Sequence, residues 1–240
     1  MVLSIEDALI TRGSFSLHIN GIFPSGIHLI TGKTGSGKTT LAEALIGRIV
    51  PEIGTIKCTG ISKKMLAMQA AERHVTTSTV TREIASFGAD RDKVLFQAGL
   101  RGYENRQILS LSRGELKKLI LMCILTSHFE LIILDEPYAG LDCTAKKMIS
   151  DTISTTIPDF RSDICIILTH DLSSLPPVDY LWEIINGKLI FLGQMPDALF
   201  HWNMDFKPLK YLLSEKITPA NIDQKSLMEA ACRIRESVPE

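Results

Sequence analysis

The segment over residues 32–39, Gly-Lys-Thr-Gly-Ser-Gly-Lys-Thr, constrains this chain more than any other feature of its sequence. It follows a short apolar run at residues 27–30 and precedes residues 39–50, where apolar side chains recur at helical spacing. Glycines let a backbone approach phosphates closely, and successive N–H groups with the positive end of a following helix neutralise their charge. This phosphate loop therefore predicts a nucleoside triphosphate site, against the alternative of a chance glycine turn.

Each residue of the phosphate loop has an expected role. We expect Lys38 to reach the outer phosphates and the hydroxyl group of Thr39 to coordinate Mg²⁺. The other positions bring backbone amides to the phosphates. The predicted nucleotide-binding residues of this region are Gly32, Lys33, Thr34, Gly35, Ser36, Gly37, Lys38, Thr39 and Thr40.

A second segment, residues 131–137, reads Leu-Ile-Ile-Leu-Asp-Glu-Pro. An apolar strand that ends in two acids places both at the carboxyl edge of a sheet, where ligands bind in open α/β folds. We expect Asp135 to hold Mg²⁺ through water and Glu136 to polarise an attacking water molecule. The alternative, a solvated acidic turn after a strand, is less favoured beside a phosphate loop.

A third segment, residues 111–115, reads Leu-Ser-Arg-Gly-Glu and is called the signature segment below. Ser112 and Glu115 have the spacing of a capping box that opens the following helix. A capped helix start that contains a glycine can also bind an anion. The structural and the functional interpretations are therefore compatible.

Hydrophobic patterning indicates an α/β fold. Continuous apolar strands at 131–134 and 164–168, alternating with helices at 114–127 and 145–157, predict a parallel sheet covered on both faces. Two strand-like runs, residues 2–5 and 15–19, open the chain. Asn186-Gly187 predicts a hairpin between residues 182–185 and 188–192. Further strands are expected at 54–58 and 64–68, and short helices, including residues 93–100, between about 70 and 129.

The end of the chain predicts a helical tail. Apolar residues recur there at helical spacing, and Asp223 lies near the expected helix start, which suits the helix dipole. Arg233 and Arg235 lie near its expected end. The apolar residues are Leu227, Ala231, Ile234 and Val238.

Composition excludes several classes of protein. The 240 residues carry a net charge of -1 and are 45% hydrophobic, so neither disorder nor a basic nucleic-acid-binding surface is expected. The five scattered cysteines lack Cys-x-x-Cys spacing and predict a reduced, cytosolic protein, with Cys123 and Cys165 buried. The N-terminus does not resemble a signal peptide, and no apolar run approaches the ~20 residues that span a bilayer.

In this order, the phosphate loop, the signature segment and Leu-Asp-Glu-Pro resemble the ATP-binding subunits of ABC transporters over about residues 1–200. The resemblance implies ATP and Mg²⁺ as ligands and a P-loop nucleoside triphosphatase core, a mostly parallel sheet flanked by helices. It also implies an N-terminal antiparallel β part and a helical subdomain inserted at about 70–129. Residues 201–240 would form a C-terminal helical tail.

The resemblance also implies roles for single residues. Gln69 would sense Mg²⁺ and face membrane subunits, residues 139–142 would contact an opposite subunit, and His170 would contact the γ-phosphate. Ser112 and Gly114 would bind the γ-phosphate of a second subunit's nucleotide. The simpler alternatives are a polar loop residue for Gln69, a helix cap for Asp142 and an incidental histidine. The implied catalytic residues are Glu136, His170 and Gln69, and the implied Mg²⁺ ligands are Thr39, Gln69 and Asp135.

Two departures from the family pattern concern the site. Arg113 and Glu115 replace a glycine and a glutamine of the usual signature, so Arg113 could crowd the site, add charge or face solvent. Residues 8–14 hold no aromatic side chain to stack on adenine. Phe15 is the nearest, and it alternates like a strand residue.

These features predict a subunit that binds and hydrolyses ATP, with ATP joining two ATPase subunits that are copies or paralogues. Integral-membrane permease subunits would hold the pair at the cytoplasmic face of the membrane. Gln69 followed by Thr79-Val80, Glu83-Ile84 and Phe87-Gly88 is similar to the ATPases of energy-coupling-factor importers, including cobalt and nickel systems. The alternatives are a soluble ATPase of the iron–sulfur assembly type and a subunit that binds ATP and dimerises without hydrolysis.

Overall fold

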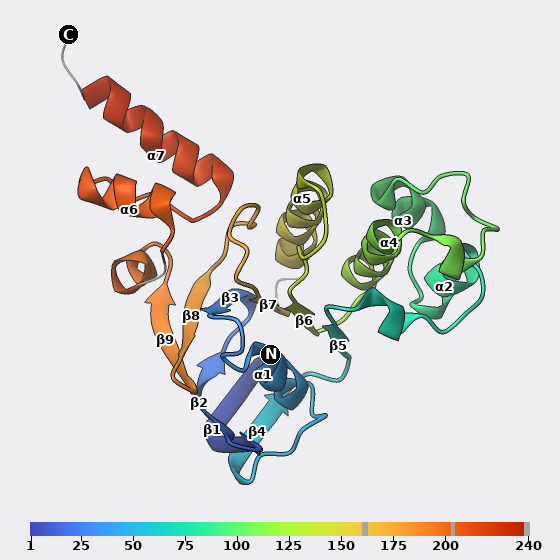
Figure 1. The fold of residues 1–240 in the computed structure, drawn as a ribbon, viewed down its shortest axis with the longest axis horizontal. Helices are drawn as coiled ribbons and strands as arrows, with labels where there is room; N and C mark the ends of the chain where they lie inside the picture. Colours follow the sequence, from blue (N-terminus) through green and yellow to red (C-terminus); the bar gives the residue numbers. More distant parts are fainter. Residues whose placement is uncertain (160–162, 203–204, 238–240) are drawn as a thin grey trace.

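One mixed sheet organises the computed structural model, which describes residues 1–159, 163–202 and 205–237. Its strands are β1 (Val2–Arg12), β2 (Phe15–Phe23), β3 (Gly26–Gly32), β4 (Ile53–Thr59), β5 (Lys64–Ala67), β6 (Leu131–Asp135), β7 (Ile164–Leu168), β8 (Tyr180–Ile185) and β9 (Lys188–Gln194). Their order is β4-β1-β2-β9-β8-β3-β7-β6-β5 (Figure 1). The run from β8 to β5 is parallel, whereas β1 pairs antiparallel with β2 and β4. The predicted α/β fold with an N-terminal antiparallel part is confirmed.

Helices cover both faces of the parallel strands. Along β6 and β7 every residue is buried. Ile132 and Ile167 pack in the cluster that contains residues of α4 (Arg113–Thr126) and α5 (Cys143–Asp159), and Ile133 and Ile166 pack in the cluster on α1 (Lys38–Leu45). Burial on both faces favours apolar side chains along the strand, which explains the continuous apolar runs that precede Asp135 and Thr169.

The carboxyl ends of the parallel strands meet at one edge of the sheet. β3 leads into the phosphate loop, β6 into Glu136, β7 into Thr169 and His170, and β5 towards Gln69. The register pairs Asp135 with Leu168, so the ends of β6 and β7 are level. The strand order therefore brings segments from distant parts of the sequence together at this edge of the sheet.

The segment between β5 and β6 is helical. It contains the 3₁₀ turns η1 (Ala71–His74) and η2 (Ile108–Ser110) and the helices α2 (Val80–Ser86), α3 (Arg91–Ala98) and α4. These helices lie together beyond β5, at the right of Figure 1. Within residues 70–129, all of which are described, the only strand-like pairing is an isolated bridge between Thr79 and Gln107.

The 3₁₀ turn η3 (Asp197–His201) leads into the tail, which contains the two helices α6 (Lys207–Ser214) and α7 (Gln224–Ser237). The tail helix near Asp223 was predicted, and the Asp223 carboxylate accepts hydrogen bonds from the amides of Lys225 and Ser226. The predicted apolar stripe is wrong at one position, because Ala230 is buried and Ala231 is exposed. Val238 lies outside the described residues. No helix in the described ranges is both long and apolar enough to cross a bilayer.

Several predicted boundaries are also wrong, most of all those of the first helix and the first strand. The helix expected at residues 39–50 ends at Leu45, because Gly47 turns the chain with a φ of 88°. The opening strand expected at residues 2–5 continues to Arg12 through a bulge at Asp7, which has a φ of 43°. The bulge lets the strand continue past the exposed acidic residues Glu6 and Asp7.

Candidate nucleotide-binding site

The phosphate loop ends at an uncapped helix start. Gly37 precedes α1 with a φ of 105° and no side-chain cap, and the first turn of α1 contains no acidic residue. The first amide groups of a helix have no partner within the helix, and the helix dipole favours an anion there. This start of α1 is therefore available to a phosphate group.

An aromatic ring lies against the loop. A Cβ atom at Gly37 would lie 2.6 Å from Cζ of Phe15, so only glycine lets the ring approach this closely. Phe15 begins β2 and also lines the cavity at the loop. The alternation that assigned Phe15 to a strand was correct, but it gave no sign that the ring reaches the phosphate loop.

One cavity of about 300 Å³ brings most of the predicted site residues together. We call it the phosphate-loop cavity. It joins residues from the ends of β3, β5, β6 and β7 with the start of β2. Its lining consists of Phe15, Thr34, Gly35, Gly37, Lys38, Thr39, Thr40, Gln69, Asp135, Glu136 and His170.

Lys38 holds a positive charge inside this cavity. Its side chain is 7% exposed, and Nζ donates hydrogen bonds to the carbonyl oxygens of Gly32 at 2.9 Å and Lys33 at 3.3 Å. Nζ also lies 3.6 Å from Oε1 of Glu136. The loop carbonyls and the Glu136 carboxylate thus stabilise the buried ammonium group.

Thr39 and Asp135 form an oxygen-rich pair. The Thr39 hydroxyl group donates to Oδ2 of Asp135 at 2.7 Å, while Oδ1 is buried with no hydrogen-bond partner among the described residues. Burial raises the pKa of Asp135, and the bond from Thr39 opposes that rise. Gln69 lines the same cavity. Carboxylate, hydroxyl and amide oxygens suit a hard cation, so these residues fit Mg²⁺.

The carboxylate of Glu136 is fixed by the residues that follow β7. Thr169 Oγ1 donates to Oε2 at 2.9 Å, and Nδ1 of His170 lies 2.7 Å from Oε1. The backbone N–H of Glu136 donates to the carbonyl of Leu168 at 2.8 Å. An oriented carboxylate beside a phosphate loop can accept a proton from a water molecule.

The signature segment lies outside the phosphate-loop cavity. Ser112 and Glu115 form the predicted capping box, and the Ser112 hydroxyl donates to Oε2 of Glu115 at 2.8 Å. Neither Ser112 nor Gly114 lines the cavity that contains Lys38. The Arg113 side chain is 97% exposed, and its Nε lies 3.9 Å from Oε1 of Glu72. Of the three possibilities for Arg113, this conformation is the solvent-facing one.

A second cavity, of about 880 Å³, lies between the signature segment and the residues that fit Mg²⁺. We call it the signature-side cavity. Gln69 and Asp135 line both cavities, and Arg113 and Lys117 line only this one. The loop after Glu136 also reaches it, through Ala139 and Gly140. Asp142 accepts from the amide of Ala145 at 2.8 Å, which is the helix-capping contact expected of the simpler alternative.

Sequence reasoning missed two polar residues beside the site, the half-buried His74 and the buried Lys117. Nε2 of His74 accepts a hydrogen bond from the amide of Met68, immediately before Gln69, at 3.0 Å. Lys117 is buried and contacts the segment after Glu136. Lys117 lies three and four residues before Ile120 and Leu121, which places it on an apolar face of the helix. A lysine in such a position is expected to have buried hydrogen-bond partners, so the sequence did contain a signal for this contact.

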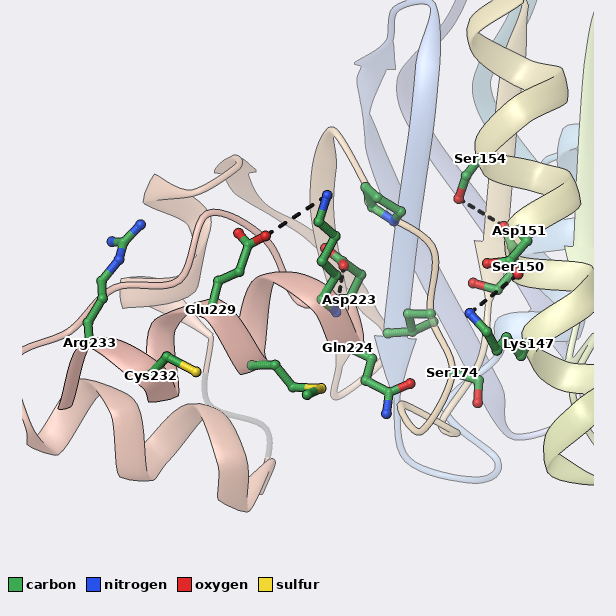
Figure 2. Close-up of a pocket in the computed structure, with 14 residues that line it drawn as sticks. Lys147, Ser150, Asp151, Ser154, Ser174, Asp223, Gln224, Glu229, Cys232 and Arg233 are labelled. Carbon is green, nitrogen blue, oxygen red and sulfur yellow. Dashed lines mark hydrogen bonds and ion pairs between the residues drawn. The ribbon is translucent and has the colours of Figure 1, made fainter. Parts of the chain in front are cut away.

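A third cavity, of about 660 Å³, lies away from the phosphate loop between α5 and α7 (Figure 2). Four of its charged residues form ion pairs within their own helix, Lys147 with Asp151 and Lys225 with Glu229. None of the predicted site residues lines it.

Comparisons with known proteins agree with this geometry. A family model described as ABC transporter matches residues 19–139. A putative ABC transporter ATP-binding protein of Pyrococcus horikoshii is 32% identical over 196 residues, covering 71% of this chain and 74% of that protein. The energy-coupling factor transporter ATP-binding protein EcfA1 of Thermotoga maritima is 28% identical over 225 residues, covering 85% and 86%.

A solved structure shows the same fold. It is a dimeric post-hydrolysis state of an ATP-binding cassette bound to ADP and Pi, with a TM-score of 0.65 and 15% identity. The match covers 78% of this chain and 96% of that chain. The family model and the relative from Pyrococcus horikoshii confirm the resemblance that the ordered motifs indicate. The chain belongs to the ABC transporter family and is an ATP-binding subunit of that family.

Proposed function

We propose that this chain hydrolyses ATP to power a transporter and works as one member of an ATPase pair. The observation that carries the proposal is the Glu136 carboxylate, held by Thr169 and His170 at the cavity that contains Lys38. A general base needs a fixed position and access to the water that it activates. Glu136 has both, since it lines the cavity and contacts neighbours through both oxygens.

The other residues of the cavity bind and orient the nucleotide. In this proposal Lys38 and the start of α1 bind the phosphates, and the Phe15 ring, which lines the same cavity, stacks on the base. Thr39, Asp135 and Gln69 would hold Mg²⁺, which neutralises charge on the phosphates when bound. His170 holds the Glu136 carboxylate through Nδ1 and lines the same cavity, so in this proposal it contacts the terminal phosphate.

A pair of subunits explains the position of the signature segment. Ser112 and Gly114 lie at the start of α4, outside their own chain's phosphate-loop cavity, and Glu115 caps this helix start in the isolated chain. A second subunit can supply these groups to the first one's nucleotide. The solved cassette named above is dimeric with ADP and Pi, which supports a pair here.

The transporter is proposed to be an importer of the energy-coupling-factor type, for a vitamin or a transition metal. The support is the relative from Thermotoga maritima, which matches over most of both chains. In this proposal residues 1–200 form the ATPase domain, with a helical subdomain at about 70–129, and residues 201–240 form the tail. Gln69 faces permease subunits at the cytoplasmic side of the membrane.

Affinity purification from solubilised membranes, with added ATP and Mg²⁺, tests this function. We expect the chain to be recovered with a second ATPase subunit, which is a copy or a paralogue, and with an integral-membrane protein. The recovered complex should release phosphate from ATP. Recovery of an active chain without any membrane protein would support a soluble ATPase instead, and a complex without turnover would support a non-hydrolysing subunit.

A further inference from the structure

Lys117 is a buried cation on the signature helix. It lies in α4, less than one turn after Gly114, and is 7% exposed. Burying an ammonium group costs free energy unless hydrogen bonds compensate for lost water. Nζ of Lys117 donates two such bonds, to the carbonyl oxygens of Glu136 and Ala139, each at 2.9 Å.

These two carbonyl groups bracket the turn that carries Glu136. Glu136 has a φ of 49°, in the left-handed region that residues with a side chain rarely adopt. Such backbone strain persists only where surrounding contacts hold it, and it concentrates at functional sites. Within the turn, the amide of Ala139 donates to the Glu136 carbonyl at 3.3 Å, so each of the two shorter bonds from Lys117 adds to the contacts that hold this turn.

Lys117 keeps its positive charge at this buried position. Burial lowers its pKa to about 8, while the carboxylates of Glu136, Asp135 and Glu72 oppose that fall. The side chain therefore remains an ammonium group near neutral pH, and two of its three N–H donors meet the two carbonyls. Lys117 does not line the phosphate-loop cavity, so no contact with nucleotide bound there is expected.

We propose that Lys117 is a positioning residue for ATP hydrolysis, because it holds the Glu136 backbone in the conformation that directs the carboxylate to His170 and the phosphate-loop cavity. The inference rests on the proposed ATPase function and adds a residue of the signature helix to it. A residue with this role should affect the rate of the chemical step and leave nucleotide binding unchanged.

The kinetic test compares three variants in the purified complex. Lys117→Met keeps the apolar stem and removes the donor, so kcat should fall roughly 10- to 100-fold with the KM for ATP unchanged. Lys117→Arg should recover most of the loss, because a guanidinium can donate to both carbonyls and the adjoining cavity gives it room. Lys93→Met is the matched control, since Lys93 is exposed on α3 and its side chain makes no hydrogen bond or ion pair with the described residues.

The second test needs no turnover. Amide hydrogen exchange of the nucleotide-free chain should be faster at residues 136–141 in Lys117→Met and near the parental rate in Lys117→Arg, with α2 and α3 unchanged. An unchanged kcat, a raised KM alone, unchanged exchange in this turn, or no recovery by arginine would overturn the proposal. An inactive parent chain would contradict the proposed ATPase function, whereas the exchange result decides separately whether Lys117 holds the turn.

Discussion

Lowering the pH should destabilise this protein through one buried histidine, His28 in β3. Its ring is fully buried between Tyr180 and Phe23, donates from Nε2 to the Pro24 carbonyl at 2.8 Å, and accepts from Trp182 at 3.1 Å. These contacts need the neutral ring, and burial lowers its pKa from 6.5 to about 4. Well above pH 6.5 the ring is neutral in both folded and unfolded chains, so it contributes no pH dependence there.

Below that value the unfolded chain takes up the proton first, so folding stability falls as the pH falls towards 4. At pH 5 the shift costs about 2 kcal/mol of the unfolding free energy, because each pKa unit corresponds to about 1.4 kcal/mol. Urea unfolding followed by tryptophan fluorescence measures this loss, since Trp182 and Trp202 are both buried.

His28→Gln is the matched control, because its amide can donate to the Pro24 carbonyl and accept from Trp182 without titrating. The variant should be less stable than the parent at pH 7.5, since it loses the ring contact with Tyr180. The difference in unfolding free energy between the parent and the variant should narrow by about 2 kcal/mol at pH 5. Other histidines, including His74, are present in both chains and cancel. Parallel stability curves for the two proteins between these pH values would refute the reasoning.

Three further predictions concern the site. Thr39→Val should raise the Mg²⁺ concentration that supports half-maximal turnover by at least about tenfold, because it removes the hydroxyl beside Asp135, and an unchanged Mg²⁺ titration would contradict this. Phe15→Leu should weaken ATP binding about three- to tenfold in a fluorescence titration through lost stacking, and equal affinity would show that the ring does not contact the base. Arg113→Gly should change the unfolding free energy by less than about 1 kcal/mol, because the contact with Glu72 is exposed; a larger loss in urea unfolding would mean that the pair supports the fold.

Most of the core could be predicted because its signals are local in the sequence. The all-apolar runs of β6 and β7 follow from burial on both faces, and Asn186-Gly187 specifies the turn between β8 and β9, where both residues have positive φ. The early end of α1 could also have been predicted, since Gly47 favours a left-handed turn. The prediction ran past it because the apolar spacing continues beyond Gly47. α6 is short, and its two buried leucines give too brief a pattern to distinguish it from a loop.

The residues of the site also divide into those that local motifs predict and those that they do not. The phosphate loop, Asp135 and Glu136 are contiguous motifs with a fixed chemical logic, so their gathering at one sheet edge could be predicted from parallel strands alone. Phe15, His74 and Lys117 act through contacts with residues far along the chain or with backbone groups. No local pattern shows that Phe15 meets Gly37, because the meeting depends on how β2 lies beside the phosphate loop.

The most direct test of the account compares ATP binding and phosphate release by the parent complex with those of Glu136→Gln. The amide keeps the size of the side chain but cannot accept a proton from water. Binding of ATP with Mg²⁺ should be unchanged, phosphate release should fall to background, and the ATPase pair should remain associated in ATP. Phosphate release by Glu136→Gln at the parental rate would contradict the assignment of Glu136 as the general base.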